Sequence, residues 1–416
     1  MATREFDLVL LGPTGYTGKY TAEYIYKAFP TTLKWALAGR SASKIEAVVR
    51  EVKNVNVDRP DPEIIPVQLN KSELDALAKR TRLIINCVGP YHLYSTPVVA
   101  ACAENGTHYV DVTGETPWLR RVIPQYHETA KENGAIIVPS CGVESAPLDI
   151  LTWYAADFTR AKLSADPTET VGCIYDIKSA GPSGGTASTI LTTLETLSIP
   201  ELLKSSDSKC LIASPLPPTR ITPRKSLFEL IFGVREVSEL GALTTSPTGM
   251  ADEAIVNRSS TLMPNHYGPR FSIRQYLRVR NVFVGVLFHY AFTIGISLLV
   301  LAPFRWVARK LWPAPGSGPT KQEVEDDITE YRLVMSTNQK GANGKPKTVL
   351  GSTSYRGGQY ELTAVAVGCA ARVILENEKK IKSISAGIVT PATLGQEYVE
   401  ELEKGGFKIG AKILDE

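Results

Sequence analysis

The chain of 416 residues lacks the patterns that assign many proteins to metal or nucleic-acid chemistry on sight. Its six cysteines are scattered, and no Cys-x-x-Cys pair or Cys/His spacing suited to zinc is present. The 46 Lys and Arg residues barely outnumber the 43 Asp and Glu residues, an excess too small to indicate nucleic-acid binding. We therefore expect reduced cysteines, no bound metal and no nucleic-acid partner.

Signatures of several enzyme classes are also missing. There is no Gly-x-Ser-x-Gly elbow and no His-Glu-x-x-His motif, and none of the 17 tyrosines has a lysine four residues later. These absences exclude the common serine-hydrolase, zinc-protease and short-chain dehydrogenase signatures. The first residues, MATREFDLVLLG, lack the basic and apolar regions of a secretory signal, so we expect none.

The segment 281–304 lacks charge altogether. Its sequence, NVFVGVLFHYAFTIGISLLVLAPF, reaches the length of roughly 20 residues that spans a hydrocarbon core. Cations flank it on both sides, which suits phosphate head groups but selects no orientation. These cations are Arg274, Arg278, Arg280, Arg305, Arg309 and Lys310. We expect membrane association, with a buried core helix or the apolar wall of a substrate cavity as the alternatives.

Residues 6–140 alternate between strand-like and helix-like stretches. Short apolar runs predict six strands, at 6–11, 33–38, 64–68, 83–87, 109–112 and 135–138. Helix-compatible stretches lie between them, at 43–53, 71–80, 96–105 and 124–133. The alternation is typical of an α/β fold with a parallel sheet covered on both faces, and six strands are enough for a Rossmann dinucleotide-binding domain. We assign residues 1–150 to this domain.

The pattern changes after residue 150. We expect a longer strand near 171–177, followed by a Gly/Ser turn and a helix, and then a surface loop rich in Ser and Pro at 205–224. A Pro/Gly-rich stretch at 313–320 is typical of a hinge, and strand-like runs at 331–338 and 347–355 predict a hairpin. The helical pattern that follows continues to the C-terminus. We assign residues 151–356 to a second α/β domain that binds the substrate.

Three glycines spaced three apart separate the first strand from the helix that follows it. In LVLLGPTGYTG, Gly12 permits a tight turn, Gly15 permits a ligand to approach, and Gly18 permits close helix packing. A pyrophosphate would then lie against the free N–H groups of a helix N-terminus. An ordinary strand-to-helix turn is the alternative, but it needs only one glycine. The predicted dinucleotide site comprises Gly12, Thr14, Gly15, Tyr16, Thr17 and Gly18.

The end of the second strand selects between NAD and NADP. NAD sites usually place Asp or Glu there for the ribose 2′-hydroxyl, whereas this chain has Arg40, followed by Ser41 and Lys44. These side chains can bind a 2′-phosphate through charge-assisted hydrogen bonds. We predict NADPH as the cofactor and hydride transfer as the chemistry, with an exposed arginine of no special role as the alternative.

The fourth predicted strand ends in NCVGPYHLY. Asn86, Gly89 and Pro90 lie at a carboxyl strand end, where open α/β sheets bind ligands, and Gly89 lets the backbone approach the nicotinamide ribose. Tyr and His are both usable acids, so we predict Tyr91 or His92 as the proton donor. A purely structural role after the strand is the alternative for each of them.

The fifth and sixth strands end in similar polar turns. HYVDVTGE places residues 111–115 at the same edge of the sheet, and PSCGVESAPLD adds Cys141 and Gly142. No histidine lies near Cys141 in the sequence to activate a thiolate. We therefore interpret Cys141 as a packed residue on the cofactor side of the site.

These motifs together resemble those of the saccharopine dehydrogenase-like oxidoreductases, a group that includes the trans-acting enoyl reductases of lipid and polyketide pathways. The resemblance is weaker at 205–280 and is carried by GPTGYTG, AGR, INCVGPY, VVAACAENGTHYVDVTGE, SCGVESAPLD, SGGT, PAPGSGPT and GIVTPATLG. It implies that a helical segment at 357–416 packs back on the Rossmann domain. It also implies that SGGT at 183–186 faces the cleft, a plain turn being the alternative, and that NADP is lined by Gly12, Gly15, Gly18, Arg40, Asn86 and Gly89.

The resemblance and the apolar segment together indicate an NADPH-dependent reductase of a C=C or C=O bond. We expect a hydrophobic lipid, polyketide or terpenoid substrate, free or bound to an acyl carrier, and a membrane or lipid-droplet location with the catalytic domain in the cytosol. A homodimer is left open. One alternative is a non-catalytic NADP-binding membrane protein. The other is an amino-acid dehydrogenase of saccharopine type, which would need several cations in its cleft.

Overall fold

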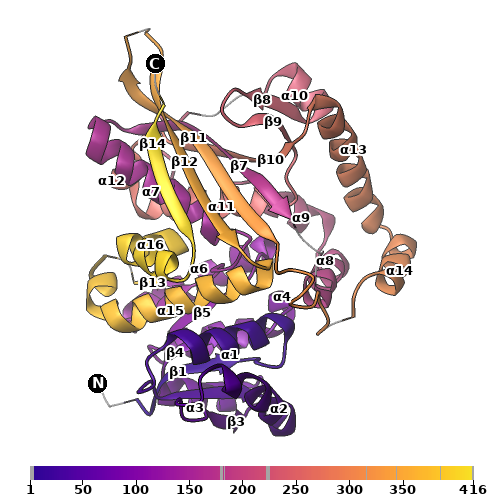
Figure 1. The fold of residues 1–416 in the computed structure, drawn as a ribbon, viewed down its shortest axis with the longest axis vertical. Coiled ribbons are helices and arrows are strands. Elements are labelled where there is room, and N and C mark those ends of the chain that lie inside the picture. Colours follow the sequence, from indigo (N-terminus) through magenta and orange to yellow (C-terminus); the bar gives the residue numbers. More distant parts are fainter. Residues whose placement is uncertain are drawn as a thin grey trace.

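The computed structural model describes residues 4–178, 181, 183–221, 225–314, 316–342, 344–384 and 386–414. The last three residues of the loop predicted at 205–224, and residue 315 of the predicted hinge, lie outside this described part. The described chain contains two seven-stranded sheets, which lie in the lower and upper halves of Figure 1. The predicted α/β class is confirmed.

The lower sheet is parallel throughout, with the order β13-β6-β5-β4-β1-β2-β3. The six predicted strands all form, and their bounds differ from the predicted ones by at most two residues. Strand order 3-2-1-4-5-6 is the order of dinucleotide-binding domains. The strands are β1 (Phe6–Leu11), β2 (Trp35–Gly39), β3 (Glu63–Pro66), β4 (Thr81–Asn86), β5 (His108–Asp111), β6 (Ile136–Val138) and β13 (Gly387–Ile388).

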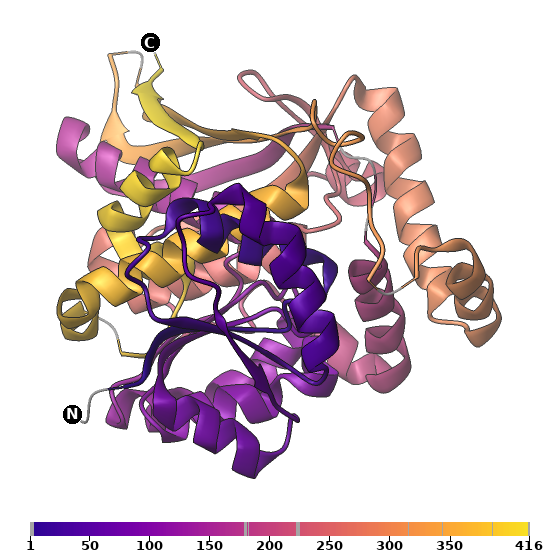
Figure 2. The ribbon, with the colours of Figure 1, turned by 60° about the horizontal axis from the view of Figure 1, so that its bottom comes forward.

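Helices cover both faces of this sheet (Figure 2). One face packs against α1 (Tyr16–Ala28), α2 (Ala42–Val52), α15 (Gln359–Ile384) and α16 (Gly395–Lys404). The other packs against α3 (Lys71–Arg80), α5 (Thr96–Glu104) and α6 (Thr116–Glu132). The prediction began α6 at Pro124, and proline is more common in the first turn of a helix than inside it. In the structure Pro124 lies inside the helix, and Pro117 occupies the first turn instead.

The upper sheet is mixed, with β7 and β10 as its parallel pair and antiparallel pairing elsewhere. The predicted hairpin forms between β11 and β12. Helices α7 (Ala146–Leu163) and α11 (Gly249–Leu262) lie between the two sheets, as the labels in Figure 1 show. The strands are β7 (Pro167–Lys178), β8 (Val234–Val237), β9 (Gly241–Thr244), β10 (Ser272–Val279), β11 (Ile328–Lys340), β12 (Pro346–Arg356) and β14 (Lys408–Ile413).

The C-terminal segment joins both sheets. Helix α15 packs on α1 in one core with α16, and β13 extends the lower sheet. Residues 408–413, which we expected to continue the helical pattern, instead form β14 and pair with β12. Helix α16 ends at Lys404, immediately before Gly405 and Gly406. The residues that follow pair with the free edge of the upper sheet at β12.

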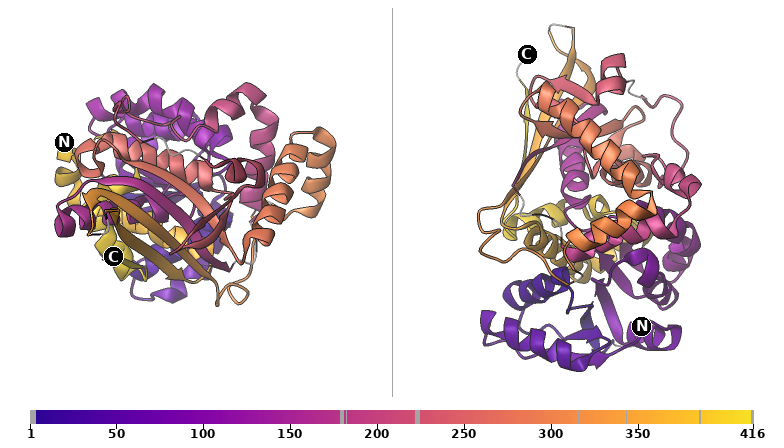
Figure 3. Two further views of the ribbon diagram at one scale, coloured as in Figure 1. Left: turned by 90° about the horizontal axis from the view of Figure 1, so that it is seen from above. Right: turned by 90° about the vertical axis from the view of Figure 1, so that its right-hand side faces the viewer.

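The uncharged segment 281–304 forms helix α13 (Val282–Leu299), and the chain then turns into α14 (Ala302–Leu311). Both helices stand at the margin of the molecule, at the right in Figure 1 and in front in the right-hand view of Figure 3. Gly285 is the one buried residue in α13, so the alternative of a buried core helix is wrong. By length and composition α13 is apolar enough to cross a membrane.

Candidate cofactor and substrate site

A cleft of about 1430 Å³ lies between the lower sheet and the upper domain. Its floor is formed by the carboxyl ends of β1, β2, β4 and β5, where open α/β sheets bind ligands. Its far arm is lined by apolar side chains of α8 (Gly184–Thr196), α9 (Ile199–Ser205) and α13. A polar end and an apolar arm therefore share one continuous space.

The glycine-rich turn at the polar end has the predicted geometry. Gly12 has φ +84°, and a Cβ atom there would lie 2.7 Å from Val88 Cγ2. A Cβ atom on Gly18 would collide with the carbonyl oxygen of Gly12, so this glycine lets α1 pack against the turn. Gly15 precedes α1 without a side-chain cap, and the helix N–H groups face the cleft, which Thr14 and Thr17 also line. This arrangement suits a pyrophosphate.

Tyr16 connects the glycine-rich turn to the upper domain. Its ring lies edge-on to that of Tyr360 at the start of α15, and its hydroxyl donates a hydrogen bond to the carbonyl oxygen of Pro319. A Cβ atom on Gly318 would lie 2.5 Å from the Tyr16 ring, which accounts for a glycine in the stretch predicted as a hinge. The turn is therefore held in place from across the cleft.

The residues predicted to bind the 2′-phosphate follow β2. Arg40 is exposed and lines the cleft. Ser41 precedes α2 and shares a hydrogen bond of 3.2 Å with the Ser43 hydroxyl, and Lys44 is exposed in the first turn of that helix. Their contacts with a phosphate stay a prediction.

The β4 turn places only part of its predicted set in the cleft. Gly89 lines the cleft. The Asn86 side chain is fully buried, where it donates to Ser95 Oγ at 2.8 Å and accepts from the Val88 N–H at 3.1 Å. Pro90 is buried just before α4 (Tyr91–Tyr94). Asn86 and Pro90 thus stabilise the turn from its buried side, away from the cleft.

Cys141 is packed, as expected, but it does not reach the cleft. Its side chain is fully buried in the core shared with α15, and its thiol donates to the carbonyl oxygen of Val138 at 3.4 Å. Burial raises the pKa of this thiol well above its usual value. The assignment of Cys141 to the cofactor-binding set is corrected on this ground.

The two predicted proton donors have hydrogen-bond partners, although His92 Nε2 is buried without one among the described residues. Tyr91 lines the cleft, yet its hydroxyl donates to the carbonyl oxygen of Asn86 at 3.0 Å, and burial raises its pKa. The His92 ring is buried, and its Nδ1 lies 2.5 Å from Glu115 Oε2. Glu115 also accepts the backbone N–H groups of Tyr91 and His92, at 2.6 and 2.9 Å. It is therefore held as an acceptor by the start of α4.

Glu144 is the cleft residue that sequence reasoning missed. Its carboxyl group lies against Gly114, where a Cβ atom would collide with it, and both residues line the cleft. Burial raises the pKa of Glu144, and the negative charge of Glu115 raises it further. The next residue, Ser145, has φ +133°, a strained conformation that tends to occur at functional sites. No local pattern in the sequence predicts this positive φ.

Neighbouring segments fix the backbone beside Glu144. The Val143 carbonyl accepts a hydrogen bond of 3.0 Å from the Tyr331 hydroxyl of β11, and its N–H donates to Thr363 Oγ1 of α15 at 3.2 Å. Across the cleft, Ser183 caps α8 and lines the cavity together with Gly185 and Thr186. The SGGT motif is therefore both a helix start and part of the cleft wall.

Comparison with known proteins agrees with this geometry. Residues 8–138 match the family model of the saccharopine dehydrogenase NADP-binding domain. A Mycobacterium tuberculosis protein with the provisional name trans-acting enoyl reductase is 32% identical, over 98% of this chain and 97% of its own length. The chain belongs to the saccharopine dehydrogenase-like oxidoreductases. The matched residues contain the glycine-rich turn and the parallel sheet described above, and the chain is an NADP-dependent oxidoreductase.

The matches with two further proteins cover almost the whole chain. A trans-acting enoyl reductase of Mycobacterium ulcerans is 28% identical over 99% of both chains. The solved structure of saccharopine dehydrogenase (L-Glu forming) from Saccharomyces cerevisiae covers 99% of this chain and 100% of its own, with a TM-score of 0.55 and 12% identity. The fold is thus shared from end to end, and the predicted family is confirmed.

Proposed function

We propose that this oxidoreductase reduces the C=C bond of an enoyl group in a hydrophobic acyl substrate, using NADPH. The cleft carries the proposal, because its cofactor end continues into an apolar arm built from α8, α9 and α13. Among the described residues that line the cleft, Arg40 is the only Lys or Arg, and it lies at the cofactor end. A saccharopine-type substrate with several charges would find no further cation there. The name of the mycobacterial relatives supports the enoyl reaction.

NADPH, when bound, supplies a hydride to one carbon of the double bond, and the other carbon must receive a proton. Glu144 is suited to hold that proton because burial and the charge of Glu115 both favour its neutral form. Glu115 lies beside it but is held by the N–H groups at the start of α4. Two neighbouring carboxyl groups with different environments are a common arrangement in acid catalysis. In this proposal Glu144 takes the role that the sequence suggested for Tyr91 or His92.

We also propose that the protein works at a membrane surface. The side of α13 that carries Phe283, Leu287 and Ile294 is more than half exposed at each of these positions, with exposed fractions of 78%, 63% and 55%. The opposite side of the helix places Phe288 and Phe292 in the wall of the cleft. A single helix layer therefore separates the apolar arm of the cleft from the surroundings. A lipid-soluble substrate could enter beside this helix.

Attachment of α13 to the upper sheet favours a helix that lies in the interface rather than one that crosses the bilayer. Gly285 packs against Val234, and its carbonyl oxygen accepts the Thr244 hydroxyl at 2.8 Å. Eighteen helical residues rise about 27 Å, slightly less than the roughly 30 Å hydrocarbon core. Leaving the sheet to cross the bilayer would expose these contacts.

Incubation of the purified full-length chain with NADPH and trans-2-enoyl thioesters of increasing acyl length tests the reaction. We expect NADPH oxidation together with a product heavier by two hydrogens, and a KM that falls as the acyl chain fills the apolar arm. Matching 3-keto thioesters with NADPH, and saccharopine with NADP⁺, are the comparison reactions, because saccharopine is a secondary amine that can only be oxidised. Faster turnover of the ketone would move the proposal to C=O reduction. Turnover of saccharopine alone, or no NADPH oxidation with any substrate, would contradict it.

A further inference from the structure

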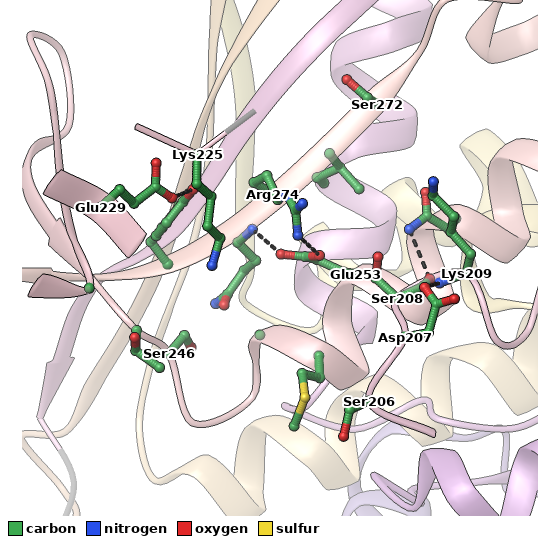
Figure 4. Close-up of a pocket in the computed structure, with 18 of the residues that line it drawn as sticks. Ser206, Asp207, Ser208, Lys209, Lys225, Glu229, Ser246, Glu253, Ser272 and Arg274 are labelled. Carbon is green, nitrogen blue, oxygen red and sulfur yellow. Dashed lines mark hydrogen bonds and ion pairs between the residues drawn. The ribbon is translucent and has the colours of Figure 1, made fainter. Parts of the chain in front are cut away.

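A second cavity, which we call the polar chamber, lies beside the cleft. Its volume is about 460 Å³, and its walls come from residues 206–209, the start of α11 and the strand β10. Ser206 and Met250 line both the chamber and the cleft, so the two spaces adjoin. Figure 4 shows the labelled Lys225 and Arg274 side chains among those that surround the chamber. A substrate in the cleft could extend one end into it.

Cationic side chains outnumber acidic ones around the polar chamber. The cations are Lys209, Arg220, Lys225 and Arg274, and the acids are Asp207, Glu229 and Glu253. Two of the acids already have strong partners. Glu253 accepts the Gln275 N–H at 2.9 Å and pairs with Arg274 at 3.5 Å, and Glu229 accepts the Tyr276 hydroxyl at 2.6 Å.

The two lysines remain available for a ligand. Within the described part of the chain, neither Lys209 nor Lys225 forms an ion pair, and both are exposed at the mouth of the chamber. His289 also lines the chamber, and its Nδ1 lies 2.7 Å from Thr245 Oγ1. Burial and the charge of Lys225 lower the pKa of His289. The positive charge at neutral pH therefore comes from the two lysines and from Arg220, which donates to the neutral side chains of Ser260 and Asn257.

Deeper in the chamber, two buried side chains have no partner among the described residues. Gln275 is 4% exposed, and neither its amide nitrogen nor its amide oxygen is hydrogen-bonded. The Ser272 hydroxyl, in a residue 3% exposed, is also without a partner. Buried polar groups of this kind are uncommon and need a ligand or water to satisfy them. Both are donors, and both line a chamber that cations surround.

We propose that the polar chamber binds the phosphate group of a phosphopantetheine arm whose acyl chain lies in the cleft. This inference rests on the proposed function, because it names the carrier of the acyl substrate. Lys209 and Lys225 neutralise the phosphate at the mouth, and Ser272 and Gln275 donate hydrogen bonds to the part of the arm that enters deeper. Coenzyme A and an acyl carrier protein present the same phosphate chemistry, so either could be the source.

Calorimetric titration of the full-length chain with 4′-phosphopantetheine and with pantetheine tests binding without any turnover. We expect the phosphorylated ligand to bind at least tenfold more tightly, and the double variant Lys209→Ala/Lys225→Ala to abolish that difference. Lys412→Ala, which removes an exposed lysine from β14, is the matched control and should change nothing. Equal binding of the two ligands to the wild-type chain, or an unchanged preference in the double variant, would overturn the inference.

Kinetics with three enoyl thioesters of the same acyl chain identify the source of the phosphate. The thioesters are those of coenzyme A, an acyl carrier protein and pantetheine. A KM that rises about tenfold in the double variant for the first two, but not for pantetheine, supports the chamber, and a rise for only one of them names its carrier. Equal KM values for all three thioesters would contradict phosphate binding in the polar chamber but would not affect the proposed reduction. Phosphate-dependent binding without NADPH oxidation would instead overturn the proposed reduction alone.

Discussion

At the scale of single residues, Glu144 and Glu115 differ in what surrounds each carboxyl group. Glu115 accepts two backbone N–H groups and lies beside His92, whereas Glu144 is partly buried in the cleft wall next to that negative charge. In Glu144→Gln, which keeps the shape but removes the proton, we expect kcat to fall by about 10²- to 10⁴-fold. NADPH affinity, measured by fluorescence titration, should stay within about twofold, because the residue lies away from the glycine-rich turn.

The pH dependence separates this role from a merely structural one. A donor must be protonated, so wild-type kcat should fall as the pH rises through the raised pKa of Glu144. The residual activity of Glu144→Gln should lack that decline. Tyr91→Phe, which removes a cleft-wall hydroxyl already bonded to the Asn86 carbonyl, is the matched variant and should keep most of the activity. The assignment fails if Tyr91→Phe loses turnover and Glu144→Gln does not.

We predict that Arg40 selects NADPH over NADH. Replacing Arg40 with Asp puts a negative charge where the 2′-phosphate is expected. A charge-assisted hydrogen bond contributes roughly 1.5–3 kcal/mol, so we expect the Kd for NADPH to rise about 10- to 100-fold. The Kd for NADH, which lacks the phosphate, should stay level or fall. Titrations with both cofactors check the prediction, and an equal loss for both would mean that Arg40 supports the fold instead.

The sequence could predict the glycines but could not identify Glu144. Gly12 and Gly18 act through local backbone geometry, which a strand, a turn and a helix determine within about a dozen residues. The properties of Glu144 depend on its partial burial in the cleft and on the charge of Glu115, which precedes α6, and neither leaves a local pattern. Cys141 shows the reverse error, since its place near a strand end suggested a contact that its burial prevents.

At the scale of elements, α13 presents one apolar side to the cleft and another to the exterior. In the triple variant Phe283→Ser/Leu287→Ser/Ile294→Ser, all changes lie on the exterior side. Each side chain buried in a membrane contributes about 1.5–3 kcal/mol, so binding to anionic phospholipid vesicles should fall well over tenfold. Cosedimentation measures the loss, and turnover of a short, water-soluble enoyl thioester should be unchanged.

A matched control for the α13 variant lies in the Rossmann domain. Val57 is 80% exposed, so Val57→Ser removes a similar apolar group far from α13 and should bind vesicles like the wild type. Extraction with carbonate distinguishes an interfacial helix from a spanning one, and we expect release without detergent. Undiminished vesicle binding by the triple variant would refute the membrane surface proposed for α13.

Some of the elements that sequence reasoning missed depend on distant partners. The strands of the lower sheet were predictable because each is a buried apolar run between turn residues. Strand β13 has only two residues and β14 lies at the edge of the upper sheet, and each pairs with a strand from an earlier part of the chain. The turn from α13 into α14 is instead local, because Arg305 donates to the carbonyl oxygens of Leu299 and Val300.

At the scale of the whole molecule, Asp149 connects three distant segments. The carboxyl group of this α7 residue accepts the Ser259 hydroxyl of α11 at 2.6 Å and the Ala392 N–H at 2.8 Å. Ser259 in turn lies 2.7 Å from the Thr390 hydroxyl. The segments SCGVESAPLD and GIVTPATLG, which carried the family resemblance, thus meet at one buried carboxyl group. Burial raises its pKa to about 7.

This buried carboxyl group makes the stability of the protein depend on pH in a defined direction. Between about pH 4 and pH 7, Asp149 is ionised in the unfolded chain but protonated in the folded one, so its contribution to stability falls as the pH rises. Asparagine mimics the protonated acid, because its amide can donate to Ser259 and its oxygen can accept the Ala392 N–H. Relative to the wild type, the free energy of unfolding of Asp149→Asn should therefore rise by about 1.4 kcal/mol per pH unit across this window. Urea unfolding of both proteins from pH 4.5 to 8 measures the gain. A difference that does not change with pH would mean that Asp149 is ionised in the folded protein and that its hydrogen bonds outweigh its burial.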